Sequence, residues 1–149
     1  NNPAAPPDGQ YDMLLTCPPY WDLERYSDDP DDLSNAKDYS RFLKTYTSIL
    51  KRSCKLVKKN RFIIIVVSNF RRSIKRQGVL GAYYPFEADT VKIMESLDIL
   101  LYNQFTLSQT FGNKRLGCRR TYVASKKIYS TTQSVLVFLK GGETYLPET

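Results

Sequence analysis

Two consecutive prolines and a tyrosine form the part of this 149-residue chain that is best suited to chemistry. Pro18, Pro19 and Tyr20 follow Cys17, directly behind a short apolar run at 11–15. Each proline fixes its own φ and lacks an N–H, and each residue before a proline is biased towards extended geometry. The pattern predicts a stiff bend at the end of a strand, with backbone carbonyls free to accept hydrogen bonds from a ligand. Such carbonyls beside the flat ring of Tyr20 suit a planar group with an exocyclic amine, such as a nucleobase.

The same tripeptide also occurs in ordinary loops and in proline-rich segments that recognition domains bind. The second alternative requires Pro18, Pro19 and Tyr20 to be exposed and flexible. A strand directly before the motif favours the ligand-binding interpretation over both alternatives.

The composition narrows the chemistry further. The chain has no histidine, and its three cysteines, Cys17, Cys54 and Cys118, are far apart and form no C-x-x-C pair. This argues against a zinc site of the usual kind and against a histidine base, and we expect no metal. Separated cysteines and the lack of a visible secretory signal favour a reducing compartment, the cytoplasm or the nucleus. No apolar run approaches the roughly 18–20 residues that span a membrane, so no membrane partner is expected.

Positive charge is concentrated in three stretches, 51–61, 71–76 and 114–127, and the net charge is +7. A solvated basic face is the simpler alternative, but three such patches in a small domain favour a polyanionic partner, nucleic acid above all. The candidates for nucleic-acid contacts are Trp21, beside the motif, and the basic residues Arg71, Arg72, Lys75, Arg76, Lys114, Arg115, Arg119, Arg120, Lys126 and Lys127.

Hydrophobic periodicity predicts a single α/β domain with the order strand, helix, strand, helix, strand, strand. Residues 1–10, which hold three prolines and a glycine, are predicted to form a flexible linker. The folded part is expected to cover 11–142, and 143–149 would be a tail. The strand–helix–strand order implies parallel neighbours with helices on the faces of the sheet. The last two strands lack a helix between them and are predicted to pair antiparallel at one side.

The first helix is predicted from apolar residues that recur at three- and four-residue spacing between Tyr39 and Val57. Asp38 is placed to cap its N-terminus, and Asn60 fits its end. An acidic loop at 22–32 precedes it.

The second helix is expected to begin at Pro85 and to turn Val91, Met94 and Leu97 inward. A basic loop at 71–84 would lead into it.

The first predicted strand is a buried one at 11–16. Arg61–Ser68 is β-branched and apolar on both faces, which is typical of a central strand covered on both sides. Ile99–Phe111 and Gln133–Lys140 are the remaining strands. Ligands of open α/β sheets bind beyond the carboxyl ends of the strands, so 17–20 and 68–70 should lie close together.

With these elements in place, the chain resembles the amino-group DNA methyltransferases. Their signature is Asp, Asn or Ser, then Pro-Pro, then an aromatic residue at the end of a strand, and here it reads Cys17-Pro18-Pro19-Tyr20. Similarity to the phage and bacterial DNA methylases extends over the segments 18–24, 26–30, 32–34, 117–127 and 132–138. The resemblance implies a partial Rossmann-like methyltransferase sheet with parallel strands, flanking helices and a terminal antiparallel pair.

What the resemblance implies about function is methyl transfer from S-adenosylmethionine to an exocyclic amino group of adenine or cytosine in DNA. The target base would be flipped out of the duplex and stacked on Tyr20. The Pro18 carbonyl and the side chain of residue 17 would accept hydrogen bonds from its amine, so Cys17, Pro18, Pro19 and Tyr20 are the predicted catalytic residues. Cys17 departs from the signature, because a thiol is only a weak donor and acceptor.

The family's glycine-rich cofactor loop has no counterpart here, because none of the seven glycines forms a G-x-G pattern after a strand. The resemblance therefore implies the C-terminal half of a methyltransferase domain, with cofactor-binding residues that this chain does not identify. A half sheet leaves an apolar edge and face, which predicts cover by a second polypeptide, by a missing N-terminal segment or by another copy. The alternative function is a non-catalytic nucleic-acid-binding or scaffold module with the same fold.

Overall fold

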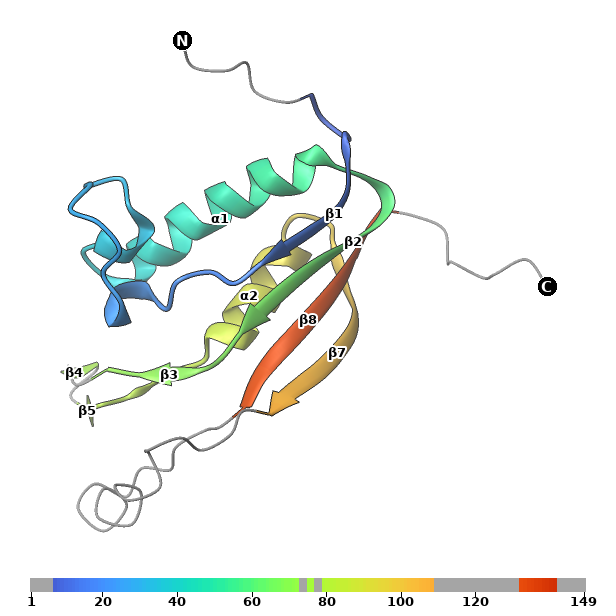
Figure 1. Ribbon diagram of the computed structural model, residues 1–149. Helices are drawn as coiled ribbons and strands as arrows, with labels where there is room; N and C mark the ends of the chain where they lie inside the picture. Colours follow the sequence, from blue (N-terminus) through green and yellow to red (C-terminus); the bar gives the residue numbers. More distant parts are fainter. Residues whose placement is uncertain (1–6, 73–74, 77–78, 109–131, 142–149) are drawn as a thin grey trace.

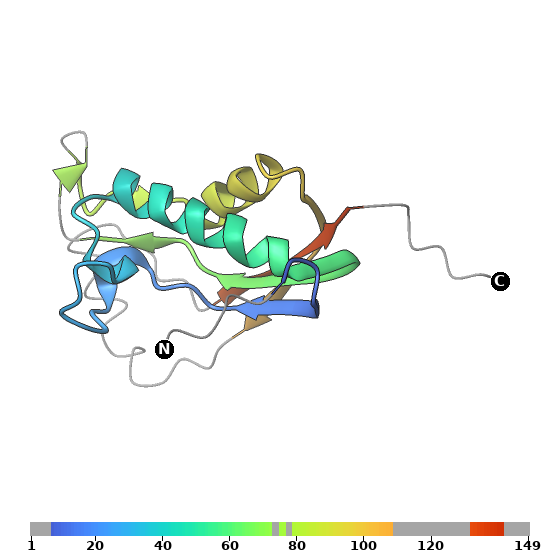
Figure 2. The same cartoon turned by 90° about the horizontal axis from the view of Figure 1, so that it is seen from above.

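In the part of the protein that the structure describes, both α-helices lie on one face of the sheet (Figures 1 and 2). The computed structural model describes residues 7–72, 75–76, 79–108 and 132–141. Its main elements are β1 (Tyr11–Thr16), α1 (Tyr39–Leu56), β2 (Val57–Val67), α2 (Phe86–Glu95), β7 (Leu100–Ser108) and β8 (Thr132–Lys140). Two 3₁₀ turns, η1 (Trp21–Leu23) and η2 (Leu33–Asn35), lie at the two ends of the acidic loop.

The strand order in the sheet is β1-β2-β8-β7. β1 and β2 are parallel, whereas β8 is antiparallel to both of its neighbours. The predicted antiparallel pair is therefore confirmed. The prediction of parallel neighbours is correct for β1 and β2, which α1 connects. It is wrong for β2 and β7, which α2 connects, because β8 lies between these two strands.

Helix α1 begins where the sequence predicts. The Asp38 carboxylate accepts a hydrogen bond from the backbone N–H of Arg41 at 2.8 Å, which satisfies one of the free donors of the first turn. The helix ends at Leu56, because Val57 is already extended and 1% exposed under the core. The placement of Asn60 at the helix end is wrong: Asn60 lies inside β2 with a φ of 56°.

The two predicted buried strands are covered on one face only. Ile63 and Ile65 of β2 are fully buried beneath the helices, while the alternate residue Ile64 is half-buried on the other face. The expectation that β1 is buried is wrong within the described residues, because Met13 is 55% and Leu15 59% exposed. The reason is that β1 is an edge strand and that Met13 and Leu15 lie on the face of the sheet that carries no helix (Figure 2).

The second helix confirms the predicted start, with Pro85 as the residue before Phe86. Met94 is fully buried, and Val91 and Leu97 pack against the core. The predicted strand at 99–111 corresponds to β7, which is described as far as Ser108 because residues 109–111 lie outside the described part. The predicted strand at 133–140 corresponds to β8, which ends at Lys140 as predicted.

The predicted basic loop contains short paired strands. β3 (Phe70–Arg71) pairs with β6 (Tyr83–Tyr84), and β4 (Lys75–Arg76) with β5 (Val79–Leu80), both antiparallel. The rings of Phe70 and Tyr84 stack at 5.2 Å between their centroids. Phe70 and Tyr84 are buried and extend the core beyond the carboxyl end of β2, where Figure 1 shows β3.

Candidate nucleobase site

The Pro-Pro corner opens onto a cavity. β1 ends at Thr16, Cys17 is exposed and Pro18 is buried. Thr16, Cys17, Pro18 and Pro19 line one side of a cavity of about 500 Å³, and residues of α1 and the acidic loop line the other. Outside the sheet ladder and the helices, no backbone hydrogen bond among the described residues ends on the Pro18 carbonyl. The corner therefore has both the space and the acceptor that a ligand amine requires.

Tyr20 is held firmly by groups from the ends of two other strands. Its hydroxyl oxygen accepts a hydrogen bond from Nε2 of Gln133 at 2.9 Å and another from the backbone N–H of Ser68. Its ring meets the rings of Phe70 and Phe86 edge-on, with 6.0 Å between centroids in each case. Burial raises the pKa of the Tyr20 phenol, so the group stays neutral. The predicted proximity of 17–20 and 68–70 is confirmed.

A second polar group fixes the wall beside Tyr20. The side-chain oxygen of Asn69 accepts a hydrogen bond from the backbone N–H of Glu87 at 3.0 Å and so caps α2. The Glu87 carboxylate accepts hydrogen bonds from Gln104 at 2.6 Å and from Ser134 at 2.8 Å. Sequence reasoning missed Glu87, Gln104 and Gln133, because they come from separate elements and match no motif.

Trp21 does not have the predicted role. Its side chain is 4% exposed, and its indole N–H donates to the Ala36 carbonyl at 2.8 Å. Because the ring is packed between Tyr39 and Tyr84, it is not available to nucleic acid and instead anchors the acidic loop to the core.

The two basic candidates that follow β2 differ from one another. Arg72 forms an ion pair with Asp22, and its guanidinium lies 5.9 Å from the Trp21 ring centroid. Arg71 is exposed; it donates to the Gly81 carbonyl at 3.1 Å and lies over the Tyr83 ring at 5.0 Å. Arg71 can therefore reach a phosphate, whereas Arg72 would first have to leave Asp22.

For the remaining basic candidates, the described part of the structure includes no side chain. Lys75 and Arg76 belong to β4. The other six lie outside the described residues, namely Lys114, Arg115, Arg119, Arg120, Lys126 and Lys127.

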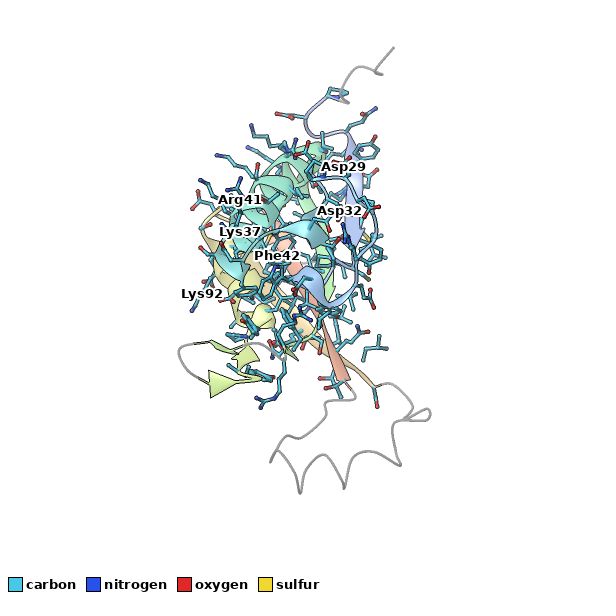
Figure 3. The ribbon with its side chains drawn as sticks, turned by 90° about the vertical axis from the view of Figure 1, so that its left-hand side faces the viewer. Asp29, Asp32, Lys37, Arg41, Phe42 and Lys92 are labelled. Atoms are coloured by element: carbon cyan, nitrogen blue, oxygen red, sulfur yellow. The ribbon has the colours of Figure 1, made fainter. Side chains whose placement is uncertain are left out.

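The acidic loop is ordered by its own carboxylates. Asp32 accepts hydrogen bonds from Ser27 at 2.7 Å and from the backbone N–H of Ser34 at 2.8 Å, and these bonds lower its pKa. Figure 3 shows Asp29 and Asp32 on one side of the view, with the cations Lys37 and Arg41 on the other.

Among the described residues, no group of three or more acidic or cysteine side chains is placed to hold a metal. No described helix is long and apolar enough to cross a membrane.

Solved structures with a similar fold include DNA methylases. A protein of Thermus thermophilus assigned as a DNA modification methylase, solved with S-adenosyl-L-methionine, superimposes with a TM-score of 0.65 at 19% identity, over 95% of this chain and 50% of that one. The cytosine-N4-specific PvuII DNA methyltransferase gives a TM-score of 0.60 at 13% identity, over 92% and 45%. The M1.HpyAVI–SAM complex gives 0.50 at 12% identity, over 95% and 51%.

The chain has a methyltransferase-like α/β fold. It spans about half the length of each of these solved chains. No protein-family model and no curated protein matches it in sequence. The likeness at these identities establishes the fold.

Proposed function

We propose that this chain is the target-base half of a DNA methyltransferase that methylates an exocyclic amino group of adenine or cytosine. The observations that support this most directly are the Pro-Pro corner, which opens onto a cavity, and the fixed ring of Tyr20, which follows the corner in sequence. The fold that it shares with DNA methyltransferases is the second support.

The residues of this chain would bind and orient the base. A nucleotide flipped from the duplex stacks on an aromatic ring, which is the role of Tyr20. The Pro18 carbonyl and the Cys17 sulfur accept hydrogen bonds from the amine, which orients the nitrogen lone pair and stabilises positive charge on nitrogen. The amine becomes acidic as it is alkylated and can lose its proton to water, so a strong base is not required.

The methyl donor would be S-adenosylmethionine, which supplies an electrophilic methyl group. The described residues hold no glycine-rich turn between a strand and a helix that could cradle it. We assign the cofactor to polypeptide beyond this stretch, and we expect no measurable cofactor binding by residues 1–149 alone.

The bare face of the sheet supports a completing partner. The strand register places these apolar side chains on the face opposite the helices: Met13, Leu15, Phe62, Ile64, Val66, Leu100, Phe105, Leu107, Val135, Val137 and Leu139. Phe105 is 59% and Leu100 67% exposed. Parallel strands are normally covered on both faces, and the free edge of β1 is open to a further strand. The partner would be the remaining half of the domain, as a preceding segment or a second polypeptide, with a second copy of this chain as the competing possibility.

DNA would approach the end of the sheet that carries the corner. Arg71 is exposed there. Neutralising phosphates releases counterions, so DNA affinity should fall steeply with salt concentration. A flat salt dependence would contradict this part of the proposal.

The decisive experiment uses the tagged native protein, purified so that any completing segment or subunit is retained. It is incubated with tritiated S-adenosylmethionine and unmethylated DNA, and the nucleosides are then separated by mass. We expect N6-methyladenine or N4-methylcytosine from the wild type and neither from Tyr20→Ala. The matched control is Tyr11→Ala, an exposed tyrosine at the start of β1 that does not line the cavity, which should retain activity. Formation of 5-methylcytosine, or of no methylated base, would refute the proposal.

A scaffold function is the second candidate, and Cys17 is the observation that favours it. A thiol binds an amine more weakly than the Asp, Asn or Ser of the resembled signature. Under this alternative the wild type transfers no methyl group, while duplex binding is unchanged by Tyr20→Ala because only phosphate contacts matter.

A further inference from the structure

A second cavity lies at the end of the sheet opposite the Pro-Pro corner. It has a volume of about 440 Å³ and is lined by the ends of α1 and α2, the start of β2 and the end of β8. Figure 1 shows these four ends together, away from the carboxyl ends of β1 and β2. The length of β2, 11 residues, separates the two sites by about 35 Å at about 3.3 Å per residue. A ligand in this cavity would therefore not occupy the proposed nucleobase site.

Four lysines line this cavity, and one of them has an evident structural role. The Lys140 ammonium donates to the carbonyls of Cys54 at 2.7 Å and Lys55 at 3.2 Å, and also to that of Val57. These carbonyls lie at the C-terminus of α1, where the helix dipole attracts a cation. Lys140 thus offsets the negative end of the helix that would otherwise repel an anion.

The other three lysines, Lys51, Lys55 and Lys59, have no ion-pair partner among the described residues. The adjacent Lys58 does have one, because its ammonium lies 3.0 Å from the Asp12 carboxylate. Lys51 and Lys55 are four residues apart on α1, a spacing at which like charges repel. An anion between them would remove that repulsion.

The lining carries a net positive charge over an apolar floor. Four lysines against the single carboxylate of Asp98 leave an excess of three positive charges. Cys54 and Ile99 are 3% and 4% exposed and form the floor. Burial raises the pKa of the Cys54 thiol to about 11, so it is a neutral, apolar part of that floor. Flexible ammonium groups around an apolar base suit a phosphate carried on a small organic body.

We propose that this cavity binds a phosphate group through Lys51, Lys55 and Lys59, at a site separate from the nucleobase corner. The phosphate belongs to a free nucleotide or to a nucleic-acid backbone, two sources with the same chemistry. The proposal does not depend on methyl transfer, so either idea can fail without the other.

The experiment titrates the full chain with three probes: inorganic phosphate, AMP and a 12-nucleotide single-stranded DNA. Amide signals of Ile99 and Gly141, which line the cavity, are followed by NMR at constant ionic strength. The expected result is saturable movement of both signals. Binding of AMP or phosphate identifies a free ligand, and binding of the oligonucleotide alone identifies the backbone; either result supports the site. If neither signal moves with any of the three probes, the site is overturned.

Two charge variants separate this site from general attraction to a basic protein. Lys51→Glu with Lys55→Glu should weaken binding about tenfold or more, since two charged contacts become repulsive. Lys44→Glu with Lys92→Glu makes the same change in net charge at exposed helix positions outside the cavity and should leave affinity within about twofold. An equal loss in both variants refutes the site. The milder pair Lys51→Gln and Lys55→Gln repeats the test if charge reversal disturbs the end of α1.

Discussion

Replacing Tyr20 by phenylalanine separates the hydrogen bonds of its hydroxyl from the contacts of its ring. The change removes only the hydroxyl oxygen, which accepts hydrogen bonds from Gln133 at 2.9 Å and from the Ser68 amide. The ring keeps its edge-on contacts with Phe70 and Phe86. Two half-buried donors lose their shared acceptor, at about 1 kcal/mol for each hydrogen bond, so unfolding should become easier by about 1–2 kcal/mol.

Urea unfolding of wild type, Tyr20→Phe, Gln133→Leu and the double variant measures this directly. The double-mutant cycle should give a coupling energy of about 0.5–1.5 kcal/mol between Tyr20 and Gln133, which isolates their hydrogen bond from the rest. If Tyr20→Phe unfolds at the wild-type urea concentration, the hydroxyl does not hold the ring and the geometry argued for the site is wrong.

The same variants should behave differently towards a nucleobase. Stacking of a base on an aromatic ring contributes about 1–3 kcal/mol, so Tyr20→Ala should weaken the capture of an unpaired 2-aminopurine by about 5- to 150-fold. Tyr20→Phe keeps the ring and should stay close to wild type. The measurement is 2-aminopurine fluorescence in a duplex that carries the base opposite a mismatch. Equal loss in Phe and Ala variants would show that the ring is not the stacking surface.

Three further outcomes are expected. Asp38→Ala should lower the free energy of unfolding by about 1 kcal/mol, because it removes the cap of α1, and urea unfolding measures this; no change would contradict the cap. Lys58 and Arg61 lower the pKa of Asp12 from its usual value of 3.8. The ionised carboxylate therefore stabilises the fold fully above pH 3.8, and this contribution is lost as the pH falls through the lowered pKa. Asp12→Asn should therefore be destabilised relative to wild type at pH 6 and match it at pH 2, with a difference that shrinks at high salt. Cys17→Ser should increase the methyl-transfer rate of the native preparation and Cys17→Ala decrease it, since a hydroxyl is the better acceptor; the reverse order would remove Cys17 from the site.

Local features of the sequence determined much of the fold. The spacing of apolar residues between Tyr39 and Val57, with Asp38 before it, defines α1 because capping and the periodicity of a helix act over a few residues. The β-branched run at 63–67 defines the core of β2 for the same reason. The stiff corner at Pro18 and Pro19 also follows from covalent geometry, which needs no tertiary contact.

Contacts between distant residues were decided by the tertiary structure. Gln133 reaches Tyr20 across 113 positions of sequence, and only the insertion of β8 beside β2 brings the two together. Trp21 looked like a surface aromatic next to a functional motif, yet the rings of Tyr39 and Tyr84 enclose it. The sequence alone determined the main helices and strands and the corner, since these depend on neighbours along the chain, whereas it did not predict the short strands β3–β6. The packing decided which side chains surround the corner and which face of the sheet stays bare, since burial and strand order depend on the whole molecule.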